Sequence, residues 1–256
     1  MGDLELEISV DEVTRALLLT FEELVAAWPE ARGVRGRHGT RLIVSGLPLP
    51  HLNGVFTDTR EPDADEVAEF ARTLAESSVP WCIQVRGEPT PELTEVAAHF
   101  GLNGRMQLPL MATTATDVEP ASGPYSVRRI DAKDHEAYGV ALAAGFEAPI
   151  EIMSRLAQPE ILDMPGAAGY LVEVDGEPVA TGFGLRVGDY LGIYNIATPP
   201  AHRRRGYGRA ATEAVMRDGF ADGVRVAFLQ ASTDGLPLYE LLGFRTVETW
   251  TYLVRG

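Results

Sequence analysis

The chain has 256 residues and a formal net charge of −15, and this acidity argues against a nucleic-acid partner, whose phosphates demand a basic surface. The single cysteine, Cys82, excludes an internal disulfide and a CxxC metal site, and the five histidines show no ligand spacing, so we predict no metal site. No apolar run approaches the ~18 residues of a membrane span and no secretion signal opens the chain, so we expect a cytoplasmic protein with no membrane partner.

Helices and strands alternate in the first half of the sequence. An apolar stripe at helical spacing predicts a helix over 10–28, and a periodic segment with an acidic first turn predicts another over 63–77. A third helix and four strands are expected beside them: a helix over 91–100 and strands over 41–44, 54–58, 81–86 and 106–113. Residues 113–124 then have the composition of a linker. We therefore predict two domains, 1–116 and 125–256, joined by residues 117–124.

The second half is expected to begin with a strand over 125–130 and two helices, over 132–144 and 150–162, the second broken near Pro159. Next we expect a hairpin, whose strands over 170–174 and 178–186 are joined by an Asp-Gly turn. The remaining predicted elements are a strand over 190–198, a helix over 209–220, a strand over 224–231, a short helix over 236–242 and a strand over 247–254.

The most informative motif is Arg203–Gly208 (RRRGYG), which fits the pattern Q/R-x-x-G-x-G/A between a predicted strand and a predicted helix. The unpaired N–H groups of a helix's first turn and the positive end of its dipole attract an anion. Two glycines without Cβ atoms would let phosphate oxygens approach the backbone. A glycine pair after a strand can also be a plain tight turn, and the arginines can be a solvated patch. The context favours a diphosphate site over both alternatives.

At this point the sequence resembles a known family. IATPPAHRRRGYGRAAT, followed by LQAS and LYELLGFRTV, resembles the GNAT superfamily of acyl-CoA-dependent N-acyltransferases over about residues 125–256. The resemblance implies an α/β (α+β) fold with a mixed, mainly antiparallel twisted sheet flanked by helices. It also implies direct transfer of an acyl group, usually acetyl, from CoA to a primary amine, with acetyl-CoA as co-substrate.

The resemblance assigns roles to particular residues. The loop would hold the pyrophosphate through Arg203, Arg204, Arg205, Gly206, Tyr207, Gly208 and Arg209. The backbone of Ile196, Ala197 and Thr198 would bind the pantetheine. Tyr239 would act as general acid toward the departing thiolate, although it can also simply pack the short helix against the sheet.

The general base is left open, because the strand that often carries it in the family has Tyr194 and Asn195 here. The candidates are Glu147, Glu151, Glu173, Asp189 and His202. Each of these can also be an ordinary solvated surface group. Ser232 could hold an ordered water or could simply be a turn residue.

The first half repeats the order strand, helix, strand, helix, strand, so we interpret it as a degenerate copy of the same fold. At the position of the diphosphate loop it has Thr59–Arg60–Glu61–Pro62. The negative charge of Glu61 would repel an anion there. We expect this half to support the sheet without binding CoA.

Two classes of function remain open: an N-acyltransferase, or a non-catalytic acyl-CoA-binding sensor. A nucleotide-binding protein is disfavoured because no lysine follows the glycines. The acceptor is expected to be a small-molecule or peptide amine, and neither a monomer nor a homodimer is favoured.

Overall fold

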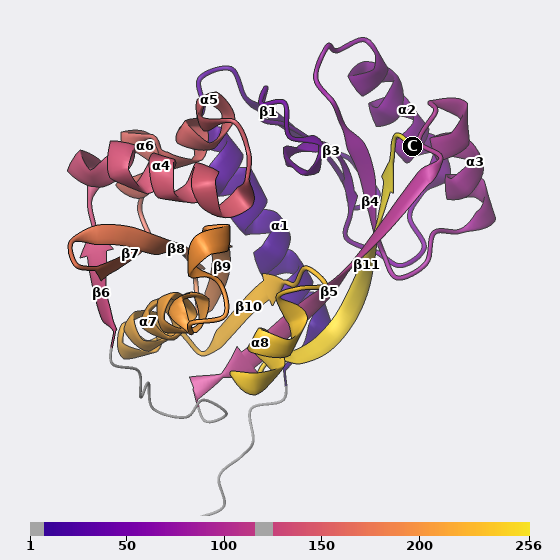
Figure 1. The fold of residues 1–256 in the computed structure, drawn as a ribbon. Coiled ribbons are helices and arrows are strands. Elements are labelled where there is room, and N and C mark those ends of the chain that lie inside the picture. Colours follow the sequence, from indigo (N-terminus) through magenta and orange to yellow (C-terminus); the bar gives the residue numbers. More distant parts are fainter. Residues whose placement is uncertain (1–7, 116–124) are drawn as a thin grey trace, which may run out of the picture. The chain divides into compact units, whose positions relative to one another are not determined.

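Helices and strands alternate along residues 8–115 and 125–256, which are the residues that the computed structural model describes (Figure 1). By their internal contacts they divide into two units. Unit 1 is Met1–Ala16, Ala112–Leu229 and Gly235–Arg245, and unit 2 is Leu17–Met111, Gln230–Asp234 and Thr246–Gly256. The helix α1, Val10–Ala26, begins in unit 1 and ends in unit 2. The linker predicted over 117–124 lies outside the described residues.

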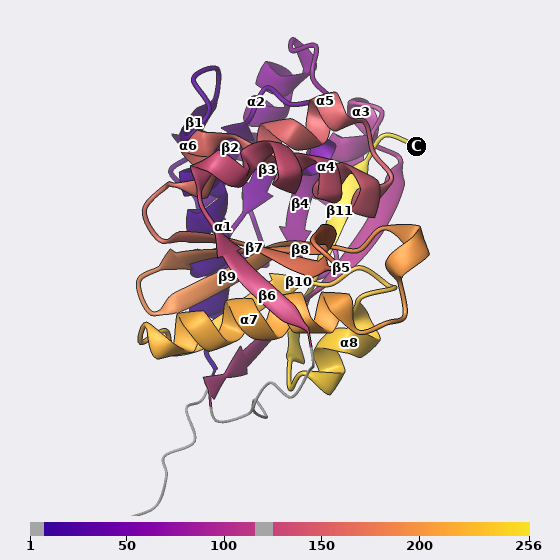
Figure 2. The ribbon, with the colours of Figure 1, turned by 60° about the vertical axis from the view of Figure 1, so that its left-hand side comes forward.

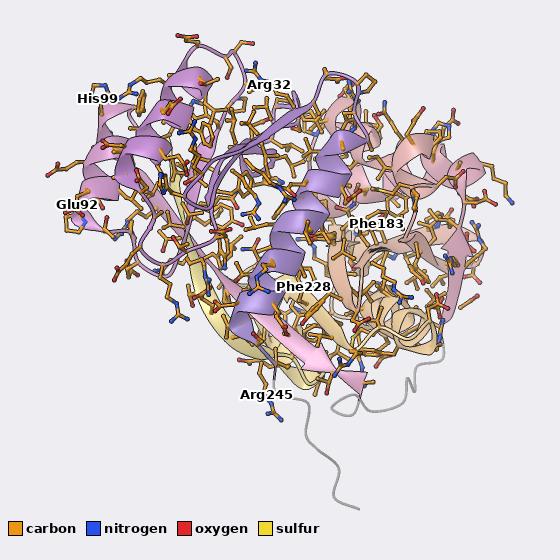
Figure 3. All side chains as sticks on the ribbon, turned by 180° about the vertical axis from the view of Figure 1, so that it is seen from behind. Arg32, Glu92, His99, Phe183, Phe228 and Arg245 are labelled. Atoms are coloured by element: carbon orange, nitrogen blue, oxygen red, sulfur yellow. The ribbon has the colours of Figure 1, made fainter. Side chains whose placement is uncertain are left out.

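The sheet of unit 1 has the strand order β6-β7-β8-β9-β10. Its strands are β6 (Ser126–Ile130), β7 (Ala167–Val174), β8 (Glu177–Val187), β9 (Tyr190–Ala197) and β10 (Val226–Gln230). Neighbours from β6 to β9 run antiparallel, whereas β9 and β10 run parallel. A parallel pair needs a crossover connection, and the helix α7 (Tyr207–Ala221) supplies it. Phe183 of β8 and Phe228 of β10, labelled in Figure 3, are buried.

Two helices cover the opposite faces of this sheet. Figure 2 shows α4 (His135–Phe146) on one side of strands β6–β9 and α7 on the other. The first turns of α7 pack Tyr207, Ala210 and Ala211 against Val172 of β7 and Ala180 of β8. Small alanines let the helix approach the strands closely, so the start of α7 is held firmly on the sheet. The described part of the unit also contains the shorter α-helices α5 (Ile150–Met153), α6 (Pro159–Leu162) and α8 (Leu236–Leu241).

The sheet of unit 2 has the strand order β1-β2-β3-β4-β11-β5. Its strands are β1 (Arg32–Arg35), β2 (Thr40–Val44), β3 (Asn53–Thr57), β4 (Cys82–Arg86), β11 (Arg245–Val254) and β5 (Gly104–Thr114). The helices α2 (Ala64–Ala75) and α3 (Pro91–His99) bury Val67, Leu74 and Leu93 in one core with Ile83 and Leu253 of the strands. Strand β1 was not predicted, because its four exposed residues have no apolar pattern and it only extends the edge of the sheet.

The C-terminal strand differs most from expectation. It was predicted to close the second half of the chain, but β11 pairs with β4 of unit 2 in an antiparallel ladder that sets Trp250 opposite Arg86 and Leu253 opposite Ile83. Trp250, Tyr252 and Leu253 are buried there. The two units therefore do not coincide with the two halves of the chain. The apolar pattern of β11 shows that it is buried, but a strand pattern does not name its neighbour.

The predicted fold class is confirmed: the sheet is mixed, mainly antiparallel and flanked by helices. Units 1 and 2 also share a topology, since β8-β9-α7-β10 and β2-β3-α2-β4 each join an antiparallel pair to a parallel neighbour through a helix. That unit 2 is a degenerate copy stays a prediction. Within the described ranges, no helix has the length and apolarity to cross a membrane.

Candidate functional site

The candidate site of unit 1 lies where the ladder between β9 and β10 ends. The parallel ladder between them covers three residue pairs, from Tyr190 with Val226 to Gly192 with Phe228. Beyond Gly192, β9 continues to Ala197 on the other side of its ladder, with β8. The backbone of Ile193–Ala197 therefore has one edge outside that ladder, and an extended ligand can hydrogen-bond to such an edge.

A β-bulge lies in the same part of β9. Thr181 is opposite Ala197 and Phe183 is opposite Tyr194, so Asn195 and Ile196 together face one residue of β8, Gly182. Asn195 has a positive φ of 54°, and its carbonyl accepts a hydrogen bond of 2.6 Å from the Thr181 hydroxyl. Bulges bend a strand and change where its backbone groups point. Here the bulge, Asn195 and Ile196, includes the first residue of the predicted pantetheine segment, Ile196–Thr198.

The loop after β9 leads directly into α7. Gly206 is the N-cap of this helix and has a φ of 85°, in the left-handed region that glycine tolerates. Asp63 and Thr90 cap α2 and α3 with their side chains, whereas no side chain among the described residues caps α7. The first-turn N–H groups of α7 are thus left for water or a ligand, as an anion site requires. The helix begins at Tyr207, two residues before the predicted start.

Several predicted residues meet around Gly208. A Cβ atom built on Gly208 would stand 3.5 Å from the Thr198 Oγ1 and 3.8 Å from side-chain carbons of Ile196 and Leu238. The end of β9, the start of α7 and the helix α8 therefore converge at this point. Tyr239, which follows Leu238, lies on α8 with its ring centroid 6.0 Å from that of Phe244.

Tyr125 holds the loop from the side, and sequence reasoning did not include it in the site. Its hydroxyl donates a 2.5 Å hydrogen bond to the Arg205 carbonyl, and its ring packs edge-on against Tyr207 with centroids 4.8 Å apart. A Cβ on Gly206 would lie 3.4 Å from the Tyr125 ring. No sequence signal marked this role, because Tyr125 is separated from the loop by 80 residues.

The four arginines of the loop are in different situations. Arg203 donates to the carbonyls of Thr198 and Gly145 and forms an ion pair with Glu147. Arg209 pairs with the buried Glu213 one turn further along α7, at 2.7 Å. The side chains of Arg204 and Arg205 are exposed and make no hydrogen bond or ion pair with any described residue. Arg204 also has a positive φ of 62°, which is unusual for a residue with a Cβ.

Tyr239 has the properties of a protonated phenol. Burial raises the pKa of Tyr239 from 10.0 to about 12, so the hydroxyl is protonated at neutral pH, as an ordinary tyrosine is, and is a weaker acid than usual. No described residue hydrogen-bonds to this hydroxyl. It can therefore donate to a group that enters the site.

Most candidate bases are already engaged. Glu147 is paired with Arg203, Glu173 with Arg128 at 2.9 Å, and Asp189 with Arg225 at 3.8 Å. Glu151 is exposed on α5, and His202 lies with its ring 6.2 Å from that of Tyr207. Ser232 belongs to unit 2 and is exposed there. None of these roles is tested, and each stays a prediction. The part of the chain that the structure describes contains no cluster of three or more potential metal ligands.

A comparison with known families matches part of unit 1 and a few residues beyond it. Residues 134–244 match the model of the acetyltransferase (GNAT) family. The match covers less than half of the chain and makes this segment similar to the GNAT family. The segment includes β9, the glycine loop, α7 and Tyr239. No curated protein sequence gives a significant match.

Solved structures share the GNAT fold at low identity. A GCN5-related N-acetyltransferase from Kribbella flavida is similar with a TM-score of 0.70 and 20% identity, covering 97% of each chain. A functionally unknown conserved protein from Staphylococcus epidermidis has a TM-score of 0.67 and 11% identity, covering 90% of this chain and 96% of the other. A GCN5-related N-acetyltransferase from Sphaerobacter thermophilus has a TM-score of 0.57 and 18% identity, covering 90% and 84%. At these identities the likeness shows the fold alone.

Proposed function

We propose that this protein is an N-acyltransferase that moves an acetyl or other acyl group from CoA directly to a primary amine. The observation that supports this most is the edge of β9 beyond its ladder with β10, which leads into the start of α7, where no described side chain caps the helix. A strand edge suits the amide groups of pantetheine, and a helix start suits a diphosphate, so the two features in this order match the chemistry of CoA.

CoA binding would use backbone groups more than side chains. In this proposal, the backbone of Ile196, Ala197 and Thr198 pairs with the pantetheine arm. The N–H groups at Gly206–Arg209 hold the diphosphate. Arg204 and Arg205, whose side chains are exposed, supply positive charge next to it.

The chemical step then needs little more than positioning. A thioester is already activated, so attack by a correctly placed amine forms a tetrahedral intermediate that a backbone N–H of the bulged strand can stabilise. As the intermediate collapses, the C–S bond breaks and the thiolate of CoA needs a proton. Tyr239 donates it, because a phenol is protonated at neutral pH and the hydroxyl of Tyr239 has no hydrogen-bond partner among the described residues.

The amine must be deprotonated before it attacks the thioester. Alkyl amines have a pKa near that of lysine, about 10.4, so most of the acceptor is charged at neutral pH. Glu147 would have to leave its ion pair with Arg203 before it could accept a proton. An acceptor that enters as the neutral amine needs no base before it attacks, and activity should then rise with pH. Its nitrogen becomes positively charged on attack and must afterwards lose one proton, either to water or to the Tyr239 phenolate left by protonation of the thiolate.

The test is a CoA-release assay with acetyl-CoA against a panel of amines, including amino acids, polyamines, amino sugars and peptides. Thiol release above hydrolysis with at least one amine, together with a mass gain of one acetyl group on that amine, is the expected result. Binding of acetyl-CoA without acceptor-dependent release by any amine would count against the proposal.

That second outcome would favour the alternative, an acyl-CoA-binding sensor. One observation speaks for it: Glu147, Glu173 and Asp189 are all paired with arginines. A sensor would bind acetyl-CoA and CoA with different affinities but would not consume the thioester. Titration calorimetry with both ligands separates the two functions.

A further inference from the structure

The guanidinium of Arg203 connects two elements of unit 1 that are distant in the sequence. Its Nε donates to the carbonyl of Thr198 at 3.0 Å, just after β9. Its Nη2 donates to the carbonyl of Gly145 at 3.1 Å, in the last turn of α4, and pairs with Glu147. One side chain thus holds the end of β9, the end of α4 and the residue after α4.

The two backbones also approach each other directly at this point. A Cβ atom on Gly145 would stand 2.7 Å from the Ala197 Cβ and 2.9 Å from the Thr198 nitrogen. Distances this short allow only a glycine, so the end of α4 rests on the backbone of Ala197–Thr198. The arginine contacts and the glycine contact are separate observations of the same junction.

The position of Arg203 suits the end of a helix. The last carbonyls of a helix lack partners within the helix and carry the negative end of its dipole. Glu147 closes α4 in a left-handed conformation with a φ of 53° and adds a carboxylate. The cation of Arg203 therefore compensates a concentration of negative charge, and its Nε and Nη2 donors are used by protein acceptors.

We propose that Arg203 is a positioning residue: it fixes the Ala197–Thr198 backbone to the end of α4, and it does not grip the diphosphate. This inference rests on the proposed function, in which that backbone holds the pantetheine arm. It assigns the loop's phosphate contacts to the exposed Arg204 and Arg205 and to the N–H groups of α7. Arg203 then affects CoA binding only through the shape of the strand that receives it.

Hydrogen exchange tests the junction without any ligand. Arg203→Ala should raise amide exchange about tenfold in the last turn of α4 and in residues 195–199, since it removes charge-assisted hydrogen bonds. Arg205→Ala removes the same charge from the same loop and should leave exchange in both segments unchanged. Glu147→Gln, which keeps the carbonyl contacts, should give a smaller increase than Arg203→Ala. Unchanged exchange in Arg203→Ala would overturn the proposal.

The salt dependence of CoA binding, measured by titration calorimetry, separates the two kinds of arginine. A phosphate contact makes affinity fall with salt, so Arg205→Ala should flatten this dependence, whereas Arg203→Ala should weaken binding by a similar factor at every salt concentration. If Arg203→Ala flattens the dependence as much as Arg205→Ala does, its guanidinium serves the phosphates and the proposal is wrong. If the unaltered protein fails to bind CoA, the proposed function fails, while the exchange comparison still decides whether Arg203 holds the junction.

Discussion

The hydroxyl of Tyr138 on α4 donates a hydrogen bond of 3.2 Å to the carbonyl of Gly182, the one residue of β8 that faces the bulge of β9. The bulge disrupts the ladder at Gly182, and Tyr138 supplies a donor there from the interior. A helix on one face of the sheet thereby supports the irregular strand that the proposed function depends on.

Replacing Tyr138 with Phe should lower the free energy of unfolding by about 1–3 kcal/mol, because the change removes a donor to a buried carbonyl. Urea denaturation followed by circular dichroism measures this. The matched control is Tyr190→Phe, which removes a 2.8 Å hydrogen bond to the exposed Glu12 and should cost clearly less. Equal losses in both variants would show that the Tyr138–Gly182 contact has no special weight.

Gly145→Ala should destabilise the junction between α4 and β9. The added methyl group would overlap Ala197 and the backbone of Thr198, and such overpacking costs about 1–3 kcal/mol. The control is Gly139→Ala on the same helix, where the nearest atoms are at 3.4 Å and the Cβ fits. Since alanine favours a helix over glycine by about 1 kcal/mol, Gly139→Ala should be neutral or stabilising. Thermal unfolding of the two variants gives the comparison, and equal effects would contradict the close approach.

Two substitutions of Arg204 can separate the effect of its strained backbone conformation on stability from the effect of its charge on CoA binding. A residue with a Cβ pays roughly 1–2 kcal/mol in the left-handed conformation, whereas glycine does not. Arg204→Gly should therefore be more stable than Arg204→Ala by about 1 kcal/mol, after allowing for the greater flexibility of unfolded glycine. Both variants should lose CoA affinity alike if the charge matters. Differential scanning calorimetry and titration with CoA measure the two effects, and equal stability of the variants would argue against strain at this position.

Tyr239→Phe should lower kcat by roughly 100-fold while CoA affinity changes by no more than about twofold, because it removes a proton donor and keeps the ring. Steady-state assays with the acceptor found by the amine panel, and calorimetry with CoA, measure these quantities. Unchanged kcat would remove Tyr239 from the mechanism.

The raised pKa of Tyr239 adds a dependence on pH. Its pKa is about 12 in the folded protein against 10.0 for an ordinary tyrosine, so the folded state retains this proton longer than the unfolded state does. The corresponding stability is fully present below pH 10.0 and is lost as pH rises toward about 12. Tyr239→Phe should therefore lose less stability than the unaltered protein across that range, which urea denaturation at several pH values can test.

In unit 2, Glu248 is a buried carboxylate shared by two arginines, Arg86 at 2.7 Å and Arg60 at 2.8 Å. Glu248→Ala should destabilise the protein by about 3–5 kcal/mol, since it leaves the buried cation of Arg86 without this partner. Removing Glu88, whose pair with Arg105 is exposed, should cost less than about 1 kcal/mol. Urea denaturation measures the free energy of unfolding of Glu248→Ala and Glu88→Ala. Equal losses in the two variants would contradict this account.

The local features of the fold could be predicted from the sequence because each depends on neighbouring residues. The periodicity of 63–77 and the strand composition of 190–198 correspond to α2 and β9 within a few residues. Around RRRGYG, a strand, a loop and a helix follow one another as predicted, since Gly206 can take the left-handed conformation at the start of α7. These preferences act over a few residues and are visible in one segment of sequence.

The partners of charged and polar side chains could not be predicted in the same way. Arg203 and Arg205 are the same residue type in one short loop, yet only the first reaches Gly145 and Glu147, which lie more than fifty residues earlier. Tyr125 and Tyr138 likewise act through contacts across the fold. Such pairs form between segments that only folding brings together.

The sequence by itself therefore determined most of the secondary structure, the glycine loop and the family resemblance, because backbone propensity and short motifs are local properties. Only the tertiary structure decided that β11 pairs with β4, that Arg203 is held by α4, and that three candidate bases are paired with arginines. Those outcomes depend on which distant groups share a buried or charged environment, and the order of residues does not state that.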